Sequence, residues 1–530
     1  MSSRTSAAPA LSDRACVAIA GAVLFALSAW PLLLVELPPF QDLPNHLASA
    51  HIAEHLDLYT DFAFNGFAKS NSLLTLFLHL AGDDHLIAAG KLFTAIILAL
   101  GSFALPYFTL HFVGRQRMVV AMLLGWPLVH NFYLVMGMMN FAFAVPLSLV
   151  LVVVLDRQRR APTIARGVAI SLLAAGVWYA HPFPLLVVGM LAVVEALRQP
   201  TWRARVQLGI ALLAPLVPIG LLVVGTALQH VIKATGAPST AASGYAFLTL
   251  WELVAHFWLD ASGAFTRWGS STLVPAVLLL YLAFRNRRAI RPMFSKPATL
   301  GLVVLYLGLP LMLSNWWYLN TRLVPFIWAA LLLRVPRSLP RVVAGGLVAC
   351  ALVFSVATGV DYVRLDRDRA ELTAGISVVP ERATLLPLLF QHRRTSEYVA
   401  TLTHAWGYYV LAKDTSAPLV FAVERSYPIT YKAFPPPALI PPALDRFAEL
   451  HGTPAQVCAA DPSGDLGRDA TDCTDAWRLL WASFWRKAEP RFDYVLAWAM
   501  PPEARELLPA SYHQVFAQGD LEIYAKHGAE

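Results

Sequence analysis

The residues best suited to chemistry follow the first apolar segment, in the run Asp42-Leu-Pro-Asn45-His46. Ionisable groups at a membrane surface are costly, so they are candidates for function. A carboxylate such as Asp42 can act as a general base, and a nearby imidazole such as His46 can orient it. A structural interpretation also stands: Asp42, with Pro44 behind it, could cap a surface helix whose wet face carries His46.

Other polar residues are predicted to share the face of the membrane that carries Asp42. These are Asp84, Lys91, Asn140, His181 and Arg322. Their positions, at the outer ends or turns of apolar segments, indicate one substrate-binding site at one rim of a helical bundle. Lys and Arg can instead snorkel to the interface, and His181 can mark a turn and bond a backbone carbonyl.

A competing pattern is His51-Ile-Ala-Glu54-His55, which matches the His-x-x-Glu-His arrangement of inverted zinc proteases. Histidines four apart on a helix can share a metal ion, with Glu54 as base. No neighbouring segment supplies an obvious third ligand, so the protease interpretation is the weaker one.

The elements that must position these residues are apolar. The 530 residues are 57% hydrophobic and only 14% charged, with a mean hydropathy of +0.55, which predicts an all-α polytopic membrane bundle. Because a membrane helix needs about 20 apolar residues, we expect about 11 spans. They are predicted near 15–37, 86–113, 118–135, 138–155, 167–180, 182–197, 206–228, 271–284, 298–313, 323–333 and 342–360.

The charge distribution orients the bundle. The chain has 41 basic and 34 acidic residues. From Asp361 onward there are 17 basic and 22 acidic residues, so the apolar part holds 24 basic and 12 acidic residues. Arginine-rich connections alternate with connections poor in basic residues, so the N-terminus is predicted to be cytoplasmic. The loop 38–85, the loop 229–270 and the tail 361–530 are then on the outer face. Basic residues spread over short loops favour an orientation signal over nucleic-acid binding.

The tail is predicted to be a separate soluble α/β domain at 361–530, following a transmembrane domain at 1–360. Strands are expected at 384–390, 418–423, 494–498, 512–516 and 521–524, and helices near 395–413, 441–450, 475–488 and 502–508. Cys458 and Cys473 lie in this outer tail, where an oxidising compartment favours a disulfide that staples a loop.

The layout resembles the GT-C class of membrane glycosyltransferases of bacterial type. The likeness rests on the Asp42 run, on Ala88-Ala-Gly-Lys91-Leu-Phe, on Tyr179-Ala-His181-Pro, on Asn320-Thr-Arg322-Leu-Val-Pro and on the tail segment 492–498 with 521–524. The chain departs from the Asp-Glu pair of protein mannosyltransferases, because Leu43 follows Asp42. The resemblance implies a polyprenyl-phosphate-linked sugar donor and a lipid, glycan or protein acceptor.

On that resemblance, Asp42 would be the base of an inverting transfer, assisted by His46. Lys91 and Arg322 would hold the phosphate, and Asn45, Asp84, Asn140 and His181 would complete the substrate site. His46 and His181 could also hold a divalent metal. A bacterial inner membrane is the expected location. The alternatives are a transporter or lipid flippase, and a non-catalytic subunit of an envelope glycan assembly system.

Overall fold

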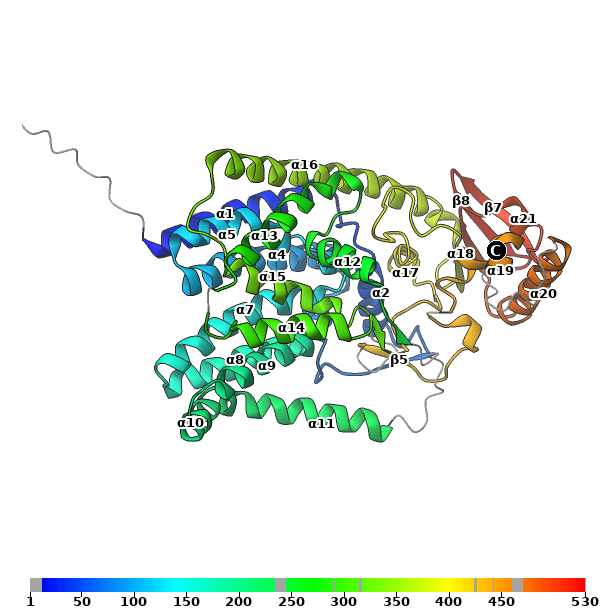
Figure 1. The fold of residues 1–530 in the computed structure, drawn as a ribbon. Helices are drawn as coiled ribbons and strands as arrows, with labels where there is room; N and C mark the ends of the chain where they lie inside the picture. Colours follow the sequence, from blue (N-terminus) through cyan, green and yellow to red (C-terminus); the bar gives the residue numbers. More distant parts are fainter. Residues whose placement is uncertain are drawn as a thin grey trace, which may run out of the picture.

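The computed structural model is a helical bundle with a small mixed domain at one end (Figure 1). It describes residues 12–233, 245–288, 291–313, 317–423, 427–441, 443–459 and 470–529. The middle of the predicted outer loop 229–270 therefore lies outside the described residues.

Within these ranges, seven helical segments are long and apolar enough to cross a membrane. Their bounds are Asp13–Leu34, Asp83–Val113, Arg115–Val135, Met139–Arg160, Trp202–Gly225, Arg267–Arg285 and Arg341–Val378. Four shorter apolar helices span Ile164–Ala180, Pro182–Leu197, Lys296–Gly308 and Thr321–Leu332. Each of these eleven segments coincides with one of the predicted apolar runs, which confirms the polytopic helical fold.

The main bundle helices run side by side along one direction (Figure 1). Helix α1 (Asp13–Ala29) packs on α4 (Leu86–Val113), α4 on α7 (Met139–Arg160), and α7 on α8 (Ile164–Ala180) and α9 (Pro182–Leu197). Basic residues from three of the arginine-rich connections line one cavity of about 350 Å³. They are Arg117, Arg285, Arg287, Arg288 and Arg334. These three connections therefore lie at the same end of the bundle.

The loop 38–85, predicted to be the first outer loop, is largely folded. It contains α2 (Leu43–Glu54), β1 (Phe62–Phe64), α3 (Leu73–Ala81) and the 3-10 turn η2 (Asp83–His85). Helix α2 is buried on opposite sides: Leu43 and Leu47 belong to the bundle core, whereas Ala48 and Ile52 pack with Trp406 of the tail. Burial on both sides explains why its sequence is not amphipathic.

Helix α16 (Arg341–Leu372) runs past the predicted domain boundary at 361 without a break. Its last three turns contain alternating Asp and Arg, including the ion pair Asp366–Arg369 at 2.8 Å. Asp–Arg pairs three residues apart stabilise a helix outside the membrane. The helix therefore carries the bundle directly into the tail, and the change of structure comes after Leu372.

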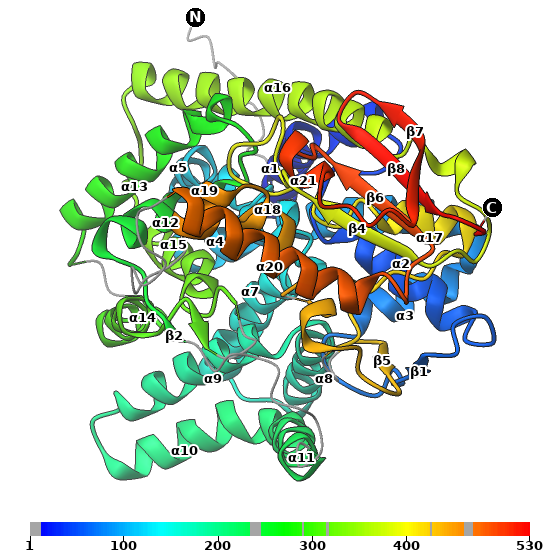
Figure 2. The same ribbon diagram turned by 90° about the vertical axis from the view of Figure 1, so that its right-hand side faces the viewer.

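The tail holds a four-stranded sheet in the order β4-β6-β8-β7 (Figure 2). Its strands are β4 (Leu385–Leu389), β6 (Tyr494–Trp498), β7 (Tyr512–Gln518) and β8 (Leu521–Lys526), with β4 and β6 parallel. All four were predicted.

The predicted strand at 418–423 is wrong: this stretch forms turns. Two of its backbone groups bond the side chain of Asn45 instead of a strand, through Leu419 O and Phe421 N. An unpredicted strand, β5 (Ile429–Tyr431), pairs antiparallel with β1 and joins the tail to the first outer loop.

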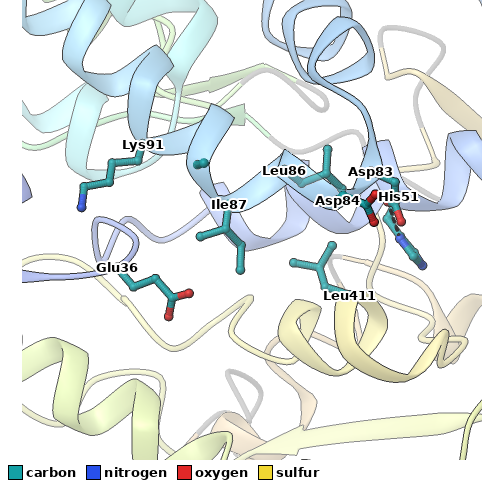
Figure 3. Close-up of a pocket in the computed structure, with 9 residues that line it drawn as sticks. Glu36, His51, Asp83, Asp84, Leu86, Ile87, Lys91 and Leu411 are labelled. Carbon is teal, nitrogen blue, oxygen red and sulfur yellow. Dashed lines mark hydrogen bonds and ion pairs between the residues drawn. The ribbon is translucent and has the colours of Figure 1, made fainter.

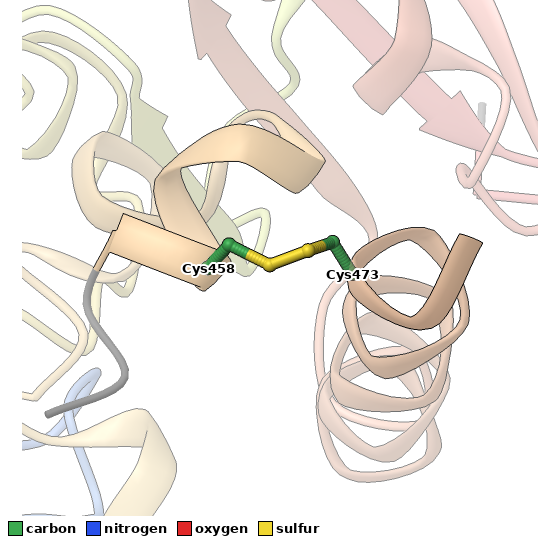
Figure 4. Close-up of a disulfide and its surroundings, with 2 residues drawn as sticks. All are labelled: Cys458 and Cys473. Carbon is green, nitrogen blue, oxygen red and sulfur yellow. A yellow bond between two sulfur atoms is a disulfide. The ribbon is translucent and has the colours of Figure 1, made fainter. Parts of the chain in front are cut away.

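The predicted tail helices are present but differ in length. They are α17 (Gly407–Lys413), α18 (Phe447–His451), α20 (Ala470–Ala488) and α21 (Pro502–Arg505), with the additional α19 (Pro454–Ala459). Cys458 of α19 and Cys473 of α20 are joined by a disulfide (Figure 4). The bond ties α19 to α20 across the undescribed residues 460–469.

Candidate functional site

Asp42 stands at the N-terminus of α2, yet its side chain makes no capping hydrogen bond. Its Oδ1 lies 3.2 Å from Nε2 of Gln41 and 3.4 Å from Nε2 of His404. The carboxylate is therefore turned toward the tail rather than toward the first turn of its own helix. The capping interpretation does not account for this side chain.

The backbone of Asp42 is fixed by the turn between α6 (Phe132–Val135) and α7. Its N–H donates to the carbonyl of Met136 at 3.0 Å. The next residue, Gly137, has a φ of 82°, and a Cβ added there would lie 2.7 Å from the Asp42 nitrogen. Both the left-handed backbone and the close approach require glycine.

His404 comes from the tail, and Asn45 of α2 holds it. The Asn45 Nδ2 group donates to Leu419 O at 2.9 Å and lies 3.2 Å from Nδ1 of His404. When His404 is neutral and accepts at Nδ1, its Nε2–H points to Asp42. Asn45, which the sequence placed among substrate-binding residues, thus orients the partner of Asp42.

The charges around His404 set its protonation. Burial lowers the pKa of His404, but the carboxylates of Asp42 and Asp445 outweigh burial and raise the pKa above its usual 6.5. Burial raises the pKa of Asp445 to about 6. The nearby His404 lowers this pKa, and the carboxylate of Asp42 raises it further. Oδ1 of Asp445 has no hydrogen-bond partner among the described residues.

His46, one turn into α2, is only partly exposed. Burial lowers its pKa to about 4 against the raising effect of Asp42. It is therefore a neutral imidazole at pH 7, able to donate or accept one hydrogen bond. Its ring packs edge-on against Phe421 at 5.3 Å between centroids. We call Asp42, His46, His404 and Asp445 the Asp42 cluster.

The Asp42 cluster continues along the rim of the bundle through Tyr318. This residue has a φ of 59°, a strained conformation for a residue with a side chain. Burial raises its pKa, and the carboxylates of Asp260 and Asp42 add to that effect, which places both carboxylates within electrostatic reach of the hydroxyl. Asp260 is 1% exposed and pairs with His256 at 3.1 Å.

Arg322 and His181 meet, as the shared rim predicted. The Arg322 Nη1 lies 3.0 Å from Nε2 of His181, and the guanidinium lies 5.5 Å from the centre of the Phe141 ring. His181 is also the first residue before α9, where its Nδ1 accepts from Phe183 N at 3.2 Å. A guanidinium beside the imidazole disfavours a metal cation at His181.

Lys91 lies in a different place, at one end of a cavity of about 580 Å³ (Figure 3). Its ammonium donates to Val35 O at 2.8 Å, and Glu36 lies beside it in the same wall. His51, Asp83 and Asp84 form the opposite end (Figure 3). Within the described ranges, no hydrogen bond or ion pair joins Lys91 to Asp42 or to Arg322.

Asn140 has a structural task in this geometry. Its Oδ1 accepts from Leu74 N and its Nδ2 donates to Asn71 O, both at 2.9 Å. These two bonds fix the start of α3 to α7. Asp84 lines the cavity of Lys91 and reaches none of the Asp42 cluster by a described contact.

The His51 motif produces a second cluster. His51 Nδ1 lies 2.7 Å from Asp83 Oδ1, and His55 Nε2 lies 3.1 Å from Asp83 Oδ2. Glu54 instead pairs with His79 of α3. In an inverted zinc protease, Glu54 would have to sit beside the metal, so the arrangement does not support that interpretation.

Sequence reasoning missed His404, Asp445 and Tyr318 as members of the site. His404 and Asp445 belong to the tail, more than 350 residues from Asp42 in sequence, and no motif surrounds them. The one available signal was that Tyr318 lies in the run that also contains Arg322. His404 and Asp445 come close to Asp42 only because the tail packs on α2.

The chain was compared with protein families, curated proteins and solved structures. No protein family and no curated protein matches the sequence. Among solved structures, the crystal structure of ArnT from Cupriavidus metallidurans in the apo state aligns with 97% of this chain and 97% of its own. The identity is 12% and the TM-score 0.49. At this level of likeness, the function has to be argued from the residues themselves.

Proposed function

We propose that this protein is a membrane glycosyltransferase of the GT-C kind. It would move a sugar from a polyprenyl-phosphate carrier to an acceptor on the outer face of a bacterial inner membrane. The observation that carries the proposal is the position of Asp42. The Met136–Gly137 turn holds its backbone N–H, and its carboxylate faces His404 of the tail.

Asp42 is suited to act as the base. Oδ1 faces His404, which leaves Oδ2 to take the proton of an acceptor hydroxyl or amine. The acceptor atom then forms a bond to the anomeric carbon of the sugar, while the bond from that carbon to the phosphate oxygen breaks. The phosphate leaves with the electron pair. Attack opposite to the leaving phosphate inverts the anomeric centre.

Arg322 is the better phosphate ligand of the two predicted cations. Its guanidinium can hold two phosphate oxygens and stabilise the charge that develops on the leaving group. Lys91 shares its cavity with Glu36, Asp83 and Asp84, and this surplus of acidic groups repels an anion. Lys91 would therefore lie outside the phosphate site.

The tail would complete the site rather than merely follow it. His404 contacts the Asp42 carboxylate from the tail, Asp445 of the tail raises the pKa of His404, and the pairing of β1 with β5 fixes the tail to the first outer loop. A lipid, glycan or protein acceptor would approach between these two parts. His46, neutral and close to Asp42, would bind a hydroxyl group of the sugar or of the acceptor.

The test is Asp42→Asn in the purified full chain, given a set of labelled polyprenyl-phosphate sugars. Loss of the base should lower turnover by about 10²–10⁴-fold, while donor binding and thermal stability stay near wild type. Asp57→Asn is the matched control, since Asp57 is exposed in the same loop.

Four outcomes would contradict the proposal in different ways. Undiminished turnover in Asp42→Asn removes Asp42 as the base. Wild-type protein that neither binds nor consumes any donor removes the transferase. Movement of an intact lipid-linked sugar across vesicles, with no bond broken, identifies a flippase, and complementation of a deletion strain by Asp42→Asn identifies a non-catalytic subunit.

A further inference from the structure

We propose that His51, His55 and Asp83 form a zinc site that locks the first outer loop to the start of α4. The site is separate from the Asp42 cluster and does not depend on the proposed transferase activity. His51 lies in the last turn of α2, His55 directly follows the helix, and Asp83 approaches from η2. One ligand atom from each lies within 4.8 Å of the others.

The distances fit a metal site that can close with small movements. Tetrahedral zinc with bonds of about 2.0–2.1 Å holds neighbouring ligand atoms about 3.3 Å apart. The Asp83 oxygens lie 2.7 Å from His51 Nδ1 and 3.1 Å from His55 Nε2. Moving these two pairs apart by about 0.6 and 0.2 Å reaches the spacing of zinc ligands, and the ligand atoms of His51 and His55 already lie within 4.8 Å of each other.

Asp414 supplies the support that zinc-binding histidines usually have. Its Oδ1 lies 2.8 Å from Nε2 of His51. A proton held on Nε2 by this carboxylate leaves the lone pair of Nδ1 free for the metal, and such carboxylate–histidine–zinc arrangements fix both tautomer and ring orientation. His51 is 4% exposed, so the ring has little freedom to turn away.

The fourth coordination position is expected to face the cavity of about 580 Å³. His51 and Asp83 both line its wall, next to Asp84 (Figure 3). Three protein ligands and one open position are typical of zinc that binds a water molecule or an anionic group. Asp414 lies directly after α17, so the site also connects the tail to the loop.

A purely hydrogen-bonded network is the competing explanation, in which a charged His51 bridges Asp83 and Asp414. The hydrogen-bonded network and the zinc site differ in whether the purified protein binds a zinc ion. A hydrogen-bonded network needs no ion, whereas a zinc site binds about one equivalent after all loosely held metal has been removed.

The experiment measures zinc by mass spectrometry in the full chain, purified through a tag without histidines. Wild-type protein, stripped with a chelator and reloaded with zinc, should hold about one ion per chain. His51→Ala, His55→Ala and Asp83→Asn should fall to background. His79→Ala, a change on the adjacent α3, should keep the metal, and Asp414→Asn should weaken zinc affinity by about 10–100-fold.

Stripped wild type that fails to rebind one equivalent of zinc overturns the proposal, as does equal loss of zinc in His79→Ala. If the alanine variants do not fold, cobalt replaces zinc in the wild type. Intense visible absorption of a four-coordinate cobalt site supports the assignment, and the weak bands of a six-coordinate ion contradict it.

Discussion

Each end of helix α2 lies beside a histidine that stands between carboxylates: His404 of the tail at the start of the helix and His51 of α2 itself near its end. The two arrangements are built differently. Near the end of α2, His51 contacts Asp83 at 2.7 Å and Asp414 at 2.8 Å, so both of its ring nitrogens have a partner. In the Asp42 cluster, His404 stands 3.4 Å from Asp42, and Asp445 keeps a carboxylate oxygen without a described partner.

This difference separates a structural role from a chemical one. Buried polar groups are normally satisfied, and an exception needs an explanation. The closed contacts of His51 suit an arrangement that joins chain segments. The loose contact and the raised pKa of Asp445 suit a site that completes its interactions only when a substrate arrives.

The largest effect after loss of Asp42 itself should come from Gly137→Ala. The added Cβ would press on the Asp42 nitrogen at 2.7 Å, and a displacement of about 1 Å can cost about 100-fold in rate. Gly114→Ala separates strain from displacement, because Gly114 has a similar φ of 77° but no atom within 4 Å of the added Cβ. The measurement is steady-state turnover of the two variants. Equal losses of turnover would refute the role of the Met136–Gly137 turn in positioning Asp42.

His404→Gln should lower kcat by about 10-fold and leave the KM for donor unchanged, because His404 orients Asp42 without binding the sugar. The pH profile gives the sharper test. His404 loses its charge as pH rises through its raised pKa, which makes Asp42 a stronger base, so wild-type turnover should rise over that range. The variant should lose this rise. The equivalent change in the second cluster, His51→Gln, should leave the profile intact.

Asp445→Asn should stabilise the protein, whereas Asp414→Asn should destabilise it. A carboxyl whose pKa rises from 3.8 to about 6 costs stability only where it is ionised. The penalty is absent below pH 3.8 and complete above pH 6, where it amounts to about 2–3 kcal/mol. Unfolding midpoints at pH 4 and pH 7 test the sign. A stabilisation that persists at pH 4 would contradict the assignment.

The sequence predicted the bundle well because apolar segments of membrane length are an unambiguous physical signal. It predicted Asp42, His181 and Arg322 as rim residues because ionisable groups are rare in such a chain. It could not reveal that Asn140 fixes α3, or that Asn45 orients His404, since amide side chains carry no directional information in sequence. The two clusters also depend on how the tail docks on α2, and that docking is made by scattered residues.

The smallest effect is expected from Glu54→Gln, which completes the comparison on α2. Glu54 lies between His51 and His55 in sequence but pairs with the half-exposed His79. Exposed pairs of this kind contribute about 0–1 kcal/mol. The variant should therefore keep turnover, zinc content and the unfolding midpoint close to wild type. A large loss of turnover or of zinc would contradict the assignment of Glu54 to a surface ion pair with His79.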